Sequence, residues 1–284
     1  METVLNLCDI MPKDTIAKKY IAQMRQKSFK YKRIYVGSYF CGNKFLSLKE
    51  KEYADFLTAA QLHGIEITVV IPILTPTNWD NGMSMLSNLL KGFCNINEIV
   101  VNDIGTMRYV YNNYDVELIF GRMLNKTYRD FRNADYYNSN VPQKIFNSFY
   151  LSMFEKYNIK KIELDFGFNT LLFPPSTKKL QMCIHTPLVY LSTCNICEFA
   201  SIKKDLDKKF RTSDRCGIEC AEHFIKYENV TDNTAVVHYK IGCGIYFLHN
   251  NYDKVKDIDV AYRNIYNPFL EEVVYEDFGT VEQY

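Results

Sequence analysis

The sequence lacks the features that mark several classes of protein. Its net charge is only +1, so the chain as a whole has no excess charge that would attract nucleic acid or an anionic membrane. The amino terminus shows no positively charged segment before a long apolar run, and the apolar run at 67–74 is far too short to cross a bilayer. We therefore expect a cytoplasmic protein without a membrane span.

Glycine, proline and tryptophan are scarce: the 284 residues contain 12, 8 and 1 of them, respectively. The sequence also shows no internal repeat, no low-complexity segment and no obvious linker between domains. Hydrophobic residues make up 47% and charged residues 24%, which is ordinary for a globular protein and argues against disorder as the main state. Cysteine, in contrast, is abundant, with nine residues.

Strand-like and helix-like segments alternate through the first two-thirds of the chain. Apolar, β-branched runs predict strands at 4–9, 33–40, 65–74, 97–103, 116–122, 159–166 and 179–190. Apolar residues at helical spacing predict helices at 14–27, 47–64, 83–93, 106–114 and 143–158. This alternation indicates parallel β-α-β units, and six or seven of them within about 190 residues favour a (β/α) barrel, complete or irregular, over a doubly wound open sheet.

The pattern changes after Cys220. Residues 235–250 are strand-like, with a hairpin expected around Gly242 to Gly244, and the acidic tail is expected to form a closing helix. We therefore predict an α/β fold in which residues 1–234 form a barrel-like domain with a cysteine-rich segment. Residues 235–284 are predicted to be a short β/α extension that packs on the same domain.

Four cysteines form a C-x2-C-x18-C-x3-C pattern, namely Cys194, Cys197, Cys216 and Cys220. Disulfides are disfavoured in a reducing compartment, so clustered thiols indicate metal binding or redox chemistry. Thiolates bind both zinc and iron–sulfur clusters, and two short-spaced pairs can converge on one centre. The pattern alone leaves zinc, an iron–sulfur cluster and plain buried thiols open.

Other candidate residues follow predicted strands directly. Cys41 comes after one strand, Asp103 after another, and Arg122 and Asn125 after a third. The carboxyl ends of barrel strands collect catalytic and cofactor-binding groups. The guanidinium of Arg122 suits a carboxylate or phosphate. The alternatives are a structural thiol at Cys41, a helix cap at Asp103 and a turn cap at Asn125.

The stretch IELDF, at 162–166, places Glu163 and Asp165 on one face of a strand because side chains alternate along it. Acidic residues in such an apolar strand need partners, which makes both candidates for an interior site. His185 ends the next strand and is a candidate base or ligand, with a hydrogen-bonded core histidine as the alternative. The candidate catalytic residues are thus Asp103, Arg122, Asn125, Glu163 and His185.

Six stretches, in this order, resemble the peptidase U32 family, also called the collagenase-like protease family: YVGSYFCGNKF, VNDIG, GRMLNKT, IELDF, HTPLVYLSTC and CGIEC. The likeness runs over residues 30–225. It is closest to the short, single-domain members that act as accessory proteins in oxygen-independent ubiquinone biosynthesis. Two departures are Thr186, where a glycine is usual, and Asp165, where a serine is usual.

The resemblance implies a 4Fe–4S cluster held by four cysteines. Carried over motif by motif, the ligands are Cys41, Cys194, Cys216 and Cys220, with Cys197 as an alternative ligand. The resemblance also implies a part in an oxygen-independent hydroxylation, or a related modification, of a small molecule or RNA, together with a homologous partner of the same family.

Two other functions stay open at this point. One is peptidase activity, after the family's old label, although the sequence has neither an H-E-x-x-H helix nor a G-x-S-x-G elbow. The other is a non-catalytic binding module stabilised by zinc at Cys194, Cys197, Cys216 and Cys220. Cys41 matters only for the iron–sulfur cluster and Cys197 mainly for zinc, so these two residues discriminate between the hypotheses.

Overall fold

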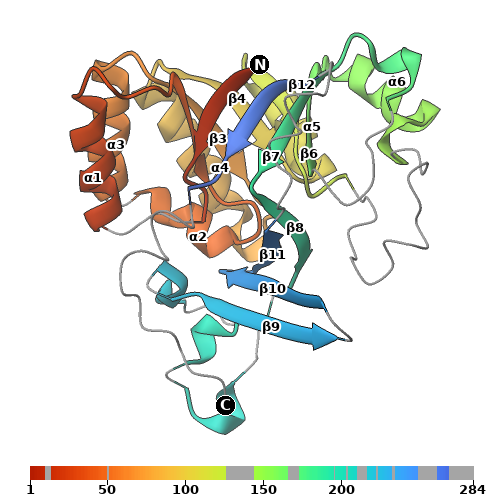
Figure 1. Cartoon of the computed structure of the whole chain (residues 1–284). Helices are drawn as coiled ribbons and strands as arrows, with labels where there is room; N and C mark the ends of the chain where they lie inside the picture. Colours follow the sequence, from red (N-terminus) through yellow and green to blue (C-terminus); the bar gives the residue numbers. More distant parts are fainter. Residues whose placement is uncertain are drawn as a thin grey trace.

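The computed structural model describes residues 1–9, 14–49, 51–125, 144–165, 173–194, 196–202, 204–209, 216–221, 223–231, 234–248 and 261–268. Within these ranges, parallel strands close into a barrel in the order β1-β12-β7-β6-β5-β4-β3-β2 (Figure 1). The strands are β1 Glu2–Asn6, β2 Arg33–Gly37, β3 Glu66–Ile71, β4 Ile96–Val101, β5 Glu117–Phe120, β6 Lys161–Asp165, β7 Gln181–Thr186 and β12 Ala261–Tyr266. The predicted (β/α) barrel is thereby confirmed, and it is closed.

Helices connect the successive strands from β1 to β6. They are α1 Asp14–Met24, α2 Gly42–Leu46, α3 Lys51–Leu62, α4 Pro76–Gly92, α5 Ile104–Asn113 and α6 Ser148–Lys156. In α3 the buried residues are Tyr53, Phe56, Leu57 and Ala60, spaced so that they share one face of the helix. No helix in the described ranges is long and apolar enough to span a membrane.

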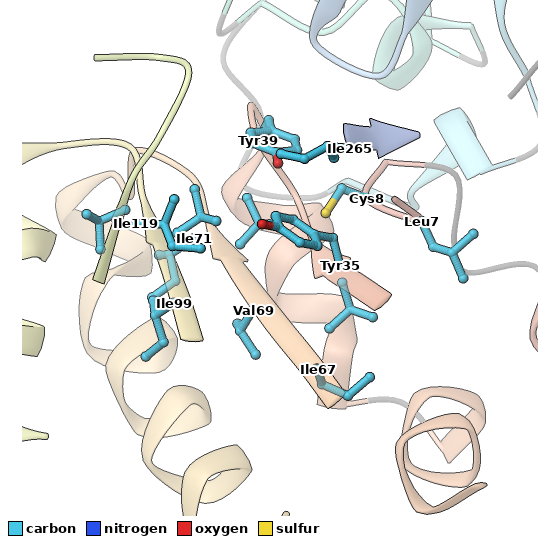
Figure 2. Packing of buried hydrophobic residues seen from close by; sticks show 14 of the residues in the cluster. Leu7, Cys8, Tyr35, Tyr39, Ile67, Val69, Ile71, Ile99, Ile119 and Ile265 are labelled. Carbon is cyan, nitrogen blue, oxygen red and sulfur yellow. The ribbon is translucent and has the colours of Figure 1, made fainter. Parts of the chain in front are cut away.

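The strands are buried on both faces, which explains their continuous apolar sequences. On β3, Ile67, Val69 and Ile71 are fully buried along one face, and Figure 2 shows them spaced along the strand. Thr68 lies on the other face, where its hydroxyl contacts Arg33 inside the barrel. The helix-covered face is therefore apolar, whereas the barrel interior contains polar and charged groups.

A second, antiparallel sheet has the strand order β8-β11-β10-β9. Its strands are β8 Leu188–Thr193, β9 Ile225–Thr231, β10 Thr234–Ile241 and β11 Gly244–Leu248. Phe40, just after β2, stacks on Tyr190 of β8 with ring centroids 4.6 Å apart and also contacts Tyr246 of β11 at 5.7 Å. This sheet therefore packs against the end of the barrel where β2 finishes, as Figure 1 also shows.

The structure divides the chain differently from the expected boundary between residues 234 and 235. That boundary falls within β10, just after its first residue, Thr234, and β12 from the C-terminal part completes the barrel between β1 and β7. The run at 179–190 forms two strands, because the chain leaves the barrel at Pro187 and continues into the antiparallel sheet. The hairpin around Gly242 to Gly244 is confirmed, while the predicted closing helix lies outside the described residues.

Candidate site at the carboxyl end of the barrel

Glu163 is the centre of a buried polar network beneath the antiparallel sheet. The Tyr39 hydroxyl donates to Glu163 Oε1 at 2.8 Å, and the Arg122 backbone N–H donates to Oε2 at 3.2 Å. His185 Nε2 lies 3.3 Å from the same Oε2. Burial, and secondarily the charge of Arg122, lowers the pKa of His185, so its imidazole is neutral at pH 7.

Arg122 and Asp165 form the second part of this network. Both side chains are at most 1% exposed and form a bidentate ion pair, in which Arg122 Nε lies 3.3 Å from Asp165 Oδ2. The guanidinium carbon lies between 5.3 and 5.7 Å from the ring centres of Tyr39, Tyr190 and Tyr246. Arg122, which the sequence suggested as a clamp for a carboxylate or phosphate, thus binds a carboxylate of the protein itself and is enclosed by aromatic rings.

Asp9 adds a third buried carboxyl at this end. It follows β1, adopts a positive φ of 64°, and accepts hydrogen bonds from the Ser38 hydroxyl and from the Tyr39 backbone N–H, the latter at 3.2 Å. Burial raises the pKa of Asp9, against the lowering effects of Ser38 and of the charge of Lys44. The loops after β1 and β2 are therefore tied together beside the Glu163 network.

Five thiols gather beside the same end of the barrel, and we call them the thiol group: Cys41, Cys197, Cys216, Cys220 and Cys243. A hydrogen bond with the Cys243 thiol is the largest effect on both Cys41 and Cys197; it lowers the pKa of Cys41 and lowers that of Cys197 to about 6. The same contacts, that with Cys197 first, raise the pKa of Cys243. The Cys243 thiol is therefore adjacent to both of the other thiols.

Cys216 and Cys220 complete the thiol group. Burial raises the pKa of Cys216 and raises that of Cys220 to about 12, and the charges of Cys41 and Cys197 add to both shifts. A Cβ at Gly242 would stand 3.9 Å from Cys220 Sγ, which places this thiol against the β10–β11 turn that carries Cys243. The C-x3-C pair therefore lies within electrostatic range of Cys41, which is far upstream in the sequence.

Cys194 and Cys197 differ in placement. The Cys194 thiol is exposed and accepts from the Ile196 backbone N–H at 3.3 Å, while its own backbone N–H donates to the Cys243 carbonyl at 3.2 Å. Cys197 is half-buried and in contact with Cys243. The Cys197 thiol therefore belongs to the thiol group. Cys194 contacts that group only through the hydrogen bond from its backbone N–H to the Cys243 carbonyl.

The donor types of the thiol group suit a soft metal centre. Within the described ranges, no set of three or more His, Cys, Asp or Glu side chains is placed so that it could hold a single metal ion. An iron–sulfur cluster is larger than one ion, and its ligands are cysteine thiolates that stand around that larger body. Cysteine sulfur is a ligand for either centre, so the donor chemistry of the thiol group is compatible with an iron–sulfur cluster as well as with zinc.

The remaining candidates have structural roles. Asp103 is the N-cap of α5: its carboxylate accepts from the Thr106 backbone N–H at 2.8 Å. Asn125 is buried in the turn after β5, where its backbone N–H donates to the Arg122 carbonyl at 3.2 Å. The alternatives stated for these two residues, a helix cap and a turn residue, describe their positions.

Sequence reasoning missed Tyr39, Asp9, Lys44 and Cys243. Tyr39 and Lys44 flank Cys41 within the stretch YVGSYFCGNKF, so their position next to a candidate ligand was an available signal. Cys243 had a weaker one, because it lies in a predicted hairpin far from the other cysteines in sequence. Only the packing of the antiparallel sheet on the barrel brings it to Cys41.

A comparison with models of protein families finds no match, and a comparison with curated proteins finds none either. The resemblance to the peptidase U32 family therefore remains a prediction from the six stretches of sequence.

Proposed function

We propose that this protein binds a 4Fe–4S cluster at the thiol group and takes part in an oxygen-independent hydroxylation, or a related modification, of a small molecule or RNA. The main support is the gathering of five thiols from separate segments beside the buried Glu163 network. When bound, such a cluster supplies electron transfer or ties chain segments together. A homologous partner of the same family is part of the proposal.

Three ligands, Cys41, Cys216 and Cys220, follow from the resemblance and also belong to the thiol group. We assign the fourth ligand to Cys197 in place of Cys194, because the Cys197 thiol contacts the group whereas that of Cys194 is exposed. We assign Cys243 as a hydrogen-bond donor to one of the ligating sulfurs, a contact that tunes such centres.

The neighbouring network supplies groups for proton transfer. The neutral imidazole of His185 can accept a proton, and Glu163 holds the Tyr39 hydroxyl proton in a hydrogen bond at Oε1. Arg122 fixes Glu163 through its backbone N–H and is itself fixed by Asp165. These residues would orient a substrate and exchange protons with it, next to the proposed electron-transfer centre.

The first experiment is purification without oxygen, followed by measurement of iron, sulfide, zinc and the visible spectrum. We expect about four irons and four sulfides per chain and absorbance near 400 nm. One zinc without colour would favour the zinc-stabilised module, and a chain without metal would remove the proposal. Hydrolysis of peptides by metal-free protein would instead favour the peptidase.

The ligand assignment has its own test with matched variants. Cys41→Ala and Cys197→Ala should each lose most of the iron, whereas Cys194→Ala should keep it. Cys94→Ala is the control, because that thiol is exposed and does not belong to the thiol group. Cys94 lies in the connection between α4 and β4. Loss of iron in Cys194→Ala with retention in Cys197→Ala would restore the ligand set implied by the resemblance.

A further inference from the structure

Lys44 has an unusual environment for a lysine. It lies in α2, three residues after Cys41, and is only 2% exposed. Its Nζ makes no hydrogen bond within the part of the chain that the structure describes. A buried ammonium without a partner is costly, because it has lost its hydration without replacement.

The other lysines that are buried in the described structure are paired. Lys161 Nζ contacts Glu98 and, at 2.8 Å, Glu117, while Lys240 Nζ lies 2.7 Å from Glu198. The protein thus neutralises buried ammonium groups elsewhere. Lys44 is the exception among these three, and it stands beside the thiol group.

The surroundings of Lys44 show where its charge acts. Burial raises the pKa of Cys220, and the charge of Lys44 is the largest opposing effect. Lys44 also acts on Asp9, whose carboxylate already accepts from Ser38 and from the Tyr39 backbone. The ammonium therefore acts electrostatically both on a carboxylate engaged by other donors and on one thiol of the group.

We propose that Lys44 is a positioning residue that gives its positive charge, and an N–H hydrogen bond, to the anionic iron–sulfur centre held by the thiol group. The inference rests on the proposed function. A cluster with four thiolates is negatively charged, and its reduction potential depends on nearby charge and on hydrogen bonds to sulfur. Reduction adds further negative charge, so a buried cation stabilises the reduced form more than the oxidised form.

The test compares Lys44→Met with Lys44→Arg in anaerobically purified protein. Lys44→Met keeps the length and removes the charge, so the ratio of reduced to oxidised cluster at a fixed potential should fall by roughly tenfold, equivalent to about 59 mV for one electron. Lys44→Arg should stay closer to the wild type. Lys49→Met is the matched control, since Lys49 is an exposed lysine in the same connection between β2 and β3. It should leave the ratio of reduced to oxidised cluster unchanged.

A second measurement separates this role from simple packing. In cluster-free protein, Lys44→Met should raise the urea midpoint of unfolding, because it removes a buried charge without a partner. In cluster-loaded protein, the same variant should lose iron faster than the wild type. Opposite effects in the two forms support the inference, and destabilisation of both with an unchanged potential would overturn it.

The outcome also distinguishes this inference from the proposed function. A wild-type chain that takes up no iron and sulfide would end both. A wild-type chain that holds the cluster, with the same potential in Lys44→Met, would end only the assignment of Lys44.

Discussion

The two ends of the barrel both bury charged side chains, but they balance them differently. At the amino end, Glu98 contacts three cations, Arg33, Lys161 and Arg263, and each of them also meets a second carboxylate nearer the surface. At the carboxyl end, Arg122 and Asp165 pair in the same way, yet Lys44, buried in the helix that follows Cys41, makes no side-chain hydrogen bond in the described structure. The amino end is therefore balanced by its own carboxylates, whereas the buried ammonium of Lys44 has no hydrogen-bond partner among the described residues.

One strand contributes to both ends. Lys161, Glu163 and Asp165 alternate along β6 and are all buried inside the barrel. Lys161 belongs to the amino-end network, and Asp165 to the ion pair with Arg122. The same two-residue period therefore supplies a structural ion pair at one end and a candidate site at the other, and the neighbours decide which role each residue has.

The largest expected effect concerns Glu98→Gln at the amino end. The change leaves three buried cations without their shared carboxylate, and loss of one partner from a buried ion pair typically costs about 3–5 kcal/mol of unfolding free energy. Glu66→Gln is the control, because that carboxylate is 47% exposed and its ion pair with Arg33 should contribute less than about 1 kcal/mol. Urea unfolding at neutral pH measures both. Equal losses would contradict the central role of Glu98.

Acid unfolding should also separate the two ends. Although burial raises the pKa of Glu98, its contacts with Arg263, Arg33 and Lys161 lower it from 4.5 to about 2. A lowered folded-state pKa contributes stability that is present above pH 4.5 and is lost as the pH falls toward 2, here on the order of 3 kcal/mol.

His185 should act at higher pH than Glu98. Its lowered pKa means that the unfolded chain binds the proton more readily, so its contribution decreases as the pH falls below about 6.5. His185→Phe should remove the loss in that upper range, and Glu98→Gln the loss below pH 4.5. Urea midpoints at successive pH values would show this, and identical profiles for both variants would refute the separation.

A smaller effect is expected for Tyr39→Phe at the carboxyl end. The variant removes the hydroxyl that donates to Glu163 at 2.8 Å and leaves a buried carboxylate with one donor fewer, which costs about 1–3 kcal/mol. Tyr111→Phe, on an exposed tyrosine of α5, is the control and should have no measurable effect. An unchanged unfolding free energy in Tyr39→Phe would mean that the hydroxyl does not support Glu163.

The barrel could be predicted from the sequence, but the candidate site could be predicted only in part, and the reason is physical. Strand and helix periods are local, so the order of elements was readable, and alternation placed Glu163 and Asp165 on one face correctly. The closure by β12 was not readable, because it depends on the chain returning to the barrel after the antiparallel sheet. The contact between Cys243 and Cys41 was not readable either, because it depends on the packing of the antiparallel sheet on the end of the barrel.

The choice between Cys194 and Cys197 shows the same limit. Both residues follow the predicted strand at 179–190 closely, and a motif can favour either one. What separates them is the direction that the chain takes after β8, where Cys194 pairs by its backbone with Cys243 and the Cys197 thiol turns toward the group. Such a distinction depends on tertiary packing and has no local signature.

The smallest expected effect concerns Asp103, which shows that position at the carboxyl end does not by itself make a site. Its carboxylate caps α5 through Thr106, so Asp103→Ala should lower the unfolding free energy by about 1 kcal/mol and leave the iron content unchanged. Asn147→Ala is the matched control: Asn147 caps α6 in the same way at 3.1 Å and should cost a similar amount. Loss of iron in Asp103→Ala, but not in Asn147→Ala, would return Asp103 to the candidate site. It would also weaken the contrast between the two ends of the barrel, because a carboxylate that already has hydrogen-bond partners would then contribute to cluster binding as well.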